Sequence, residues 1–166
     1  MIKIDRNSAV LVDFQYMLGN DRQIFVKELA FMQAGSVIPN FFHFKPPYHS
    51  KELDNGILTL QHTTKRNING LDWSDGDIPY LSLSDILTPL NSFAVVIVRG
   101  EAKKQFLTKY LATNIVDLDL GQSLTSYPNY FTNCRIHKKL PVRCALNNLF
   151  KLFVFLESSN YEIYGK

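Results

Sequence analysis

Residues 93–99 read FAVVIVR, a continuous apolar run that is followed by Gly100. An unbroken run of this kind is typical of a strand buried on both faces, so the segment predicts the centre of a sheet. Residues 101–111 follow with helical spacing of their apolar side chains, and residues 114–118 predict a further strand. The chain therefore alternates strand and helix on the C-terminal side of the central strand.

Three more strands are predicted on the N-terminal side. Residues 8–17, 23–32 and 37–44 are rich in apolar side chains, and turn-forming residues at 19–21 and at Gly35 separate them. Antiparallel neighbours can be joined by such short turns, whereas parallel neighbours need a long crossover. The three strands therefore predict an antiparallel meander.

The remaining elements complete a recognisable order. Prolines at residues 46–47 end the meander, because proline cannot donate to a ladder. Helices are predicted over residues 56–66, 82–90 and 142–157. A meander followed by alternating helices and strands requires right-handed crossovers and a mixed sheet. That order is the RNase H-like one, and we expect an α/β fold in a single domain over residues 1–166.

Composition places few limits on function. The 166 residues are 46% hydrophobic and 20% charged, as in ordinary globular proteins, and the net charge of +3 biases the chain only mildly toward acidic partners. No apolar run reaches the roughly 18 residues that span a bilayer, and the N-terminus lacks the apolar stretch of a secretory signal. We expect an intracellular protein, in the cytoplasm or the nucleus, with no membrane partner.

Glu28 is the carboxylate of the second predicted strand, where side chains alternate between two faces. Strict alternation gives Glu28 the apolar neighbours Ile24, Val26, Ala30 and Met32 on its own face. Burying an unpaired carboxylate there costs on the order of several kcal/mol, so Glu28 should bind a cation, pair with a basic residue or take up a proton. The alternative is an edge position at which Glu28 stays in water.

Cys134, His137 and Cys144 form a Cys-x2-His-x6-Cys cluster that contains both cysteines of the chain. Thiolates and an imidazole suit zinc, and a structural zinc takes four ligands. Three local ligands leave one missing, and Glu28 is the best candidate for the fourth. The alternative interpretation makes Cys144 a small buried residue of the last helix and Cys134 a loop thiol.

The first predicted strand carries Asp13 and Gln15, whose side chains share a face because they lie two residues apart. Over most of its length the chain resembles the DnaQ-like exonucleases, whose first strand carries two acids at this spacing. Their next acid lies in a helix opening after the fourth strand, where this chain has Lys103 and Lys104, with Glu101 nearby.

The last DnaQ-like motif is a His, then Ala two positions on, then an Asp. Here Arg143 stands for the His and Asn148 for the Asp. Two-metal phosphodiester hydrolysis needs several carboxylates to hold its cations. The sequence therefore predicts that the usual exonuclease mechanism is absent.

This replacement pattern is similar to the Maelstrom domain, a divergent DnaQ-like branch that lacks the exonuclease acids and binds zinc through Glu, Cys, His and Cys. The matching pieces are residues 26–30 (VKELA), 134–137 (CRIH) and 143–146 (RCAL), within a similarity over about residues 8–157. The resemblance implies contact with single-stranded RNA and a part in small-RNA (piRNA) silencing of transposons. It implies a zinc site made by Glu28, Cys134, His137 and Cys144.

Basic residues near these motifs are candidates for contact with the phosphates of RNA. The set is Lys103, Lys104, Arg135, Lys138, Lys139 and Arg143. The alternative is that these side chains form ordinary solvated faces. Three functions stay open. They are an RNA-binding domain without exonuclease chemistry, a nuclease with a remodelled site that uses Asp13, Glu28 or Glu101, and a protein-interaction module held by zinc and encoded by a mobile element or a virus.

Overall fold

The computed structural model describes residues 2–118, 127–128, 137 and 143–165. Its main sheet has the strand order β4-β3-β2-β5-β6. The strands are β2 (Ala9–Leu18), β3 (Ile24–Gln33), β4 (Asn40–His43), β5 (Val95–Val98) and β6 (Asn114–Asp117). Strand β3 is antiparallel to β2 and β4, whereas β5 is parallel to β2 and β6. The predicted RNase H-like mixed sheet, with the 93–99 run at its parallel centre, is confirmed.

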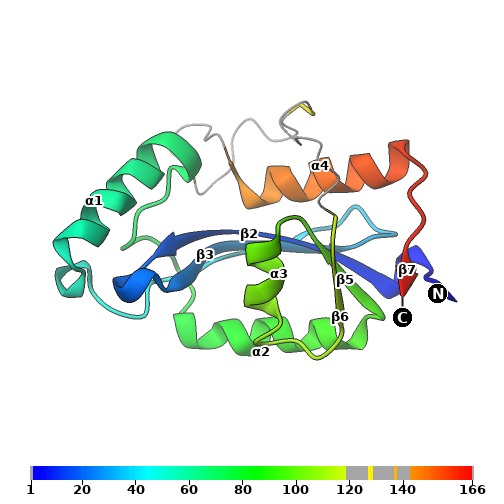
Figure 1. The fold of residues 1–166 in the computed structure, drawn as a ribbon, viewed down its shortest axis with the longest axis horizontal. Helices are drawn as coiled ribbons and strands as arrows, with labels where there is room; N and C mark the ends of the chain where they lie inside the picture. Colours follow the sequence, from blue (N-terminus) through cyan, green and yellow to red (C-terminus); the bar gives the residue numbers. More distant parts are fainter. Residues whose placement is uncertain (1, 119–126, 129–136, 138–142, 166) are drawn as a thin grey trace.

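Helices cover both faces of this sheet (Figure 1). They are α1 (Asn55–Thr64), α2 (Leu83–Leu87), α3 (Glu101–Leu107) and α4 (Ala145–Ser158). Helix α4 packs on one face in a core with Leu11 and Met32, and α2 and α3 pack on the other in a core with Val12 and Phe14. Within the described residues, no helix combines the length and apolar content that crossing a bilayer requires.

Several elements begin later or end earlier in the structure than the sequence pattern predicts. The strand predicted over 37–44 starts only at Asn40, because Pro39 cannot donate to the ladder and Val37 and Ile38 are exposed in the turn. The helix predicted over 101–111 ends at Leu107. The last helix begins at Ala145, since Cys144 has the extended backbone of a cap residue.

A β-bulge at Lys27 changes the predicted faces of β3. Gln15 pairs with Glu28 and the next residue of β2 pairs with Val26, so Lys27 has no partner of its own on β2. The extra residue sets Lys27 and Glu28 together opposite Gln15 and reverses the alternation beyond them. The prediction that Ile24 and Val26 share the face of Glu28 is therefore wrong, and both pack in the core of α2 and α3.

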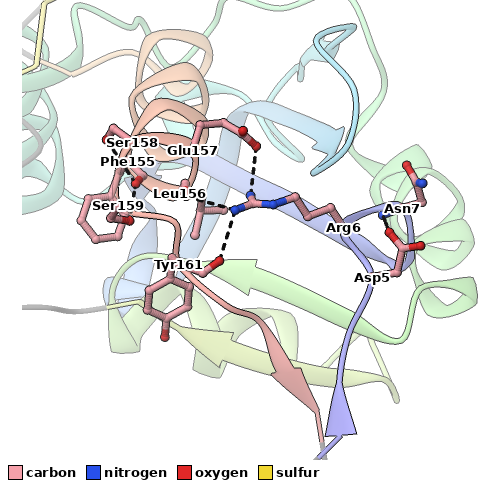
Figure 2. A network of polar contacts seen from close by, with 9 residues as sticks. All are labelled: Asp5, Arg6, Asn7, Phe155, Leu156, Glu157, Ser158, Ser159 and Tyr161. Carbon is pink, nitrogen blue, oxygen red and sulfur yellow. Dashed lines mark hydrogen bonds and ion pairs between the residues drawn. The ribbon is translucent and has the colours of Figure 1, made fainter.

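Arg6 joins the two ends of the described chain, where β1 (Ile2–Lys3) pairs with β7 (Tyr164–Gly165). Figure 2 shows its guanidinium between the last turn of α4 and the segment that follows. It donates to the carbonyls of Leu156 and Tyr161, at 3.1 and 3.2 Å, and lies 3.1 Å from the Glu157 carboxylate. Arg6 thereby ties the last turn of α4 to the segment that follows, where the Leu156 carbonyl also accepts the Tyr161 N–H at 3.1 Å.

Replacing Arg6 by Met should lower the free energy of unfolding by about 1–2 kcal/mol, since two hydrogen bonds from a charged group are lost at a partly exposed site. The midpoint of urea unfolding measures the loss. Arg22→Met is a matched control because Arg22 is exposed, and it should change the stability by less than about 0.5 kcal/mol. Equal midpoints for Arg6→Met and the wild type would contradict this role.

Candidate metal centre

Glu28 is fully buried, at 0% exposure, on the sheet face that α4 covers. Its Oε1 accepts a 2.7 Å hydrogen bond from the backbone N–H of Ala145, the first residue of α4. The unpaired N–H groups and the dipole at a helix N-terminus favour an ionised carboxylate there. Glu28 is thus a buried carboxylate bound at the start of α4, and the predicted alternative of an edge position in water is wrong.

The structure places two more of the predicted ligands beside this anion. His137 Nε2 lies 3.0 Å from Glu28 Oε2, and the His137 side chain is only 1% exposed. Cys144, the cap residue of α4, is 2% exposed. The ligand atoms of Glu28, His137 and Cys144 all lie within 4.8 Å of one another. Cys134, the fourth predicted ligand, lies outside the described residues.

This group can hold a metal ion. Ligand atoms around a tetrahedral ion with bonds of 2.0–2.3 Å are separated by roughly 3.3–3.8 Å, and the three atoms here are already close to that spacing. A thiol, an imidazole and a carboxylate offer one sulfur, one nitrogen and one oxygen in a water-poor site. Such a mixed set, gathered beside the start of α4, is one that a metal ion can bind.

His43 is a neighbour of this centre that the sequence did not point to. It is the register partner of Glu28 on β4. Burial, followed by the charge of Lys27, lowers the pKa of the imidazole, which favours a neutral His43. Its Nε2 is buried and has no hydrogen-bond partner within the described chain. Only the pairing register of β3 and β4 could have identified it.

The residues of the predicted acid site lie on the same face as Glu28, because Gln15 pairs with Glu28 and Asp13 is two residues from Gln15. Lys103 fills this site. Its Nζ lies 2.5 Å from Asp13 Oδ1, with the Lys103 and Asp13 side chains 16% and 6% exposed. Gln15 Nε2 is 3.4 Å from the other carboxylate oxygen. An ammonium therefore stands beside Asp13 where a metal-dependent nuclease would need a metal ion.

Local structure explains how Lys103 reaches Asp13. Gly100 has a φ of +111°, which only glycine adopts readily, and this conformation turns the chain from β5 directly into α3. The Asp117 carboxylate accepts a 2.7 Å hydrogen bond from the Gly100 N–H and fixes the turn. Lys103 follows in the first turn of α3. Glu101, the one acid nearby in the sequence, is exposed and accepts a hydrogen bond from Gln105.

The predicted RNA contacts are distributed unevenly. Lys103 forms an ion pair with Asp13, and Lys104 is half-buried. Arg143 is exposed, and its backbone N–H donates to the Ile68 carbonyl at 2.8 Å, which brings it beside the segment that carries exposed Arg66. Arg135, Lys138 and Lys139 lie outside the described residues.

These features define an RNase H-like α/β domain with a possible metal site and without the acid set of a two-metal nuclease. A solved structure of similar fold is the Mopeia virus exonuclease domain, fully depleted of manganese. The match has a TM-score of 0.63 at 15% identity and covers 98% of this chain and 83% of that one. At this identity the likeness shows the fold alone. No family model and no curated protein matches the sequence.

Proposed function

We propose that the chain is a zinc-stabilised, Maelstrom-like RNA-binding domain that has kept a nuclease fold without two-metal exonuclease chemistry. The observation that carries the proposal is the ion pair between Lys103 and Asp13, with an amide at Gln15 beside it. The Lys103 ammonium neutralises Asp13, the acid of the Asp13 and Gln15 pair. The amide oxygen of Gln15 is a weak substitute for a second carboxylate. The site therefore lacks the negative charge that two divalent cations need.

Zinc is the metal that suits the candidate centre. Its proposed ligands are Glu28, Cys134, His137 and Cys144. A thiolate disfavours Mg²⁺ and Mn²⁺, which prefer oxygen ligands, and favours zinc. Four protein ligands leave no open position, so the ion would join β3 to the start of α4 and have no part in catalysis.

The proposed ligand is single-stranded RNA, and the role implied by the Maelstrom resemblance is small-RNA silencing of transposons. The net charge of +3 favours a polyanion, and exposed Arg143 and Arg66 lie on adjoining segments near the N-terminus of α4. Half-buried Lys104 follows the filled acid site on α3. These side chains would contact phosphates, which gives affinity without strong sequence preference.

The test combines binding and cleavage of a labelled single-stranded RNA. We expect binding that weakens as salt increases and no product in millimolar Mn²⁺ or Mg²⁺. Arg143→Gln should weaken binding a few-fold and reduce the slope of log affinity against log salt by about 0.7, one phosphate contact. The control is Arg22→Gln, an exposed arginine in the β2–β3 turn, which should leave the slope unchanged.

Two results would replace the proposal with another function. Mn²⁺-dependent cleavage that Asp13→Ala abolishes would make the chain a nuclease with a remodelled site. A folded, zinc-containing protein that binds no RNA at low salt would make it a protein-interaction module.

A further inference from the structure

A cavity of about 340 Å³ lies between α1 and the loop at residues 71–75, over the end of β2. Its floor is apolar, since it is lined by Met17, Leu71 and Trp73, which are at most 4% exposed. Its rim carries polar side chains, among them Asp72 and Asp75. The volume is at the lower end of the roughly 300–1,000 Å³ of small-molecule sites, so the occupant must be small.

Hydrogen bonds hold both walls of the cavity in place. The loop on one side is anchored from beneath by buried Lys27, whose Nζ donates to the carbonyls of Trp73 and Asp75 at 2.6 and 2.5 Å. On the other side, Gln61 of α1 donates from Nε2 to the Leu18 carbonyl at 2.7 Å. Walls that are fixed before a ligand arrives lower the ordering cost of binding.

The two acids of the rim differ in what they contact. The Asp72 carboxylate pairs with Lys65, whose Nζ lies 2.6 Å from Oδ1. The Asp75 carboxylate is exposed, and among the described residues its side chain forms no hydrogen bond or ion pair. An ionised carboxylate only accepts hydrogen bonds, so Asp75 favours a ligand that offers donors.

The cavity lies beside the proposed RNA contacts. The helical turn that follows α1 carries exposed Arg66, and the Ile68 carbonyl in that turn accepts the Arg143 N–H at 2.8 Å. Helices α1 and α4 cover the same side of the sheet (Figure 1). An RNA strand whose phosphates contact Arg66 and Arg143 therefore runs within reach of the cavity.

We propose that the cavity receives one unstacked base of the bound single-stranded RNA and prefers guanine. Guanine has two adjacent donors, N1–H and the N2 amino group, which match the two oxygens of the Asp75 carboxylate. Uracil presents one N–H between two carbonyl oxygens, which a carboxylate repels. The apolar floor stabilises the ring by removing it from water. The inference rests on the proposed RNA binding and adds a base preference that phosphate contacts do not give.

The experiment measures binding of the full chain at low salt to two labelled single-stranded RNAs of equal length, one of uridine alone and one with a central guanosine. We expect the second RNA to bind roughly 10-fold more tightly, as one bidentate contact to a base edge typically provides. It should also change the fluorescence of Trp73, the only tryptophan of the chain, which lies in the floor of the cavity.

Two variants test the site through the ratio of the two affinities. Asp75→Asn should lower the ratio to about twofold or less, because the amide replaces an accepting oxygen by a donor. Leu58→Phe narrows the cavity that Leu58 lines and should lower the ratio as well. Asp77→Asn is the matched control, since Asp77 is an exposed acid two residues from Asp75 and is not among the residues that line the cavity. It makes the same charge change as Asp75→Asn and should keep the ratio of the wild type.

The outcomes separate this inference from the proposed function. A wild-type chain that binds neither RNA removes the proposed RNA binding, and the base site falls with it. A wild type that binds both RNAs equally tightly, or a ratio that Asp75→Asn or Leu58→Phe leaves unchanged, overturns the base site alone.

Discussion

Stripping the metal from the purified protein is expected to lower its melting temperature by about 10 °C. A ligand that binds only the folded state adds about 4 kcal/mol when its concentration is a thousand times its Kd, and a domain of this size shifts by roughly 2–4 °C per kcal/mol. The physical reason is specific to this site. Without a cation, the fully buried Glu28 carboxylate has only neighbouring protein groups such as the Ala145 N–H and His137 in place of a divalent charge.

His137→Ala should reproduce this loss without any chelator. The variant should melt close to the metal-free wild type, and adding chelator should lower its melting temperature no further, since both changes remove the same interaction. His62→Ala is the matched control, because His62 is exposed on α1. Calorimetry with elemental analysis of each sample makes the comparison. A wild type that loses its metal yet melts at an unchanged temperature would refute the structural role of the ion.

The order of elements could be predicted because their apolar patterns are long and local. The run at residues 93–99 became β5 in the parallel part of the sheet, and the three N-terminal apolar segments became the meander. The bulge at Lys27 could not be predicted. The buried Lys27 ammonium at the bulge donates to the carbonyls of Phe44, Trp73 and Asp75, which lie 17 to 48 residues away in the sequence. Periodicity within β3 carries no information on such acceptors.

Residue chemistry predicted that Glu28, His137 and Cys144 lie close together, although the predicted face of two β3 residues was wrong. Glu28 was singled out for its apolar neighbours on one face, and the bulge moved two of these, Ile24 and Val26, to the other face. Ala30 and Met32 stayed with α4, so Glu28 still lies in an apolar setting. A buried carboxylate needs a partner whichever neighbours bury it.

Lys103 shows the limit of reading charge from sequence. Two adjacent lysines at the start of a helix predict a phosphate-binding surface, and nothing local indicates that one of them is directed inward. The partner, Asp13, lies 90 positions earlier, and the pairing depends on the glycine turn that places α3 over the end of β5. The ion pair directs Lys103 toward the nearly buried Asp13, with the Lys103 side chain 16% exposed.

Lys103→Met is therefore expected to destabilise the domain by about 3 kcal/mol, where an exposed lysine would cost almost nothing. The substitution keeps the length of the side chain and removes the charge. Among the described residues, the nearly buried Asp13 carboxylate is then left with the weak contact to Gln15 at 3.4 Å. Urea unfolding of the variant measures the loss. Lys109→Met, at an exposed position in the turn that follows α3, supplies the control.

The double variant Asp13→Asn with Lys103→Met decides what the ion pair does. Each single substitution leaves one charged group, the Asp13 carboxylate or the Lys103 ammonium, without its partner, and the double variant removes both charges. The double variant should therefore lose about 2 kcal/mol less stability than the sum of the two single losses. Millimolar Mn²⁺ should raise the melting temperature of Lys103→Met, whose carboxylate can then accept a cation, and leave the wild type unchanged. Additive losses, or a wild type that Mn²⁺ stabilises as strongly as the variant, would mean that Lys103 does not close this site, and that the fold has kept a working metal position at Asp13.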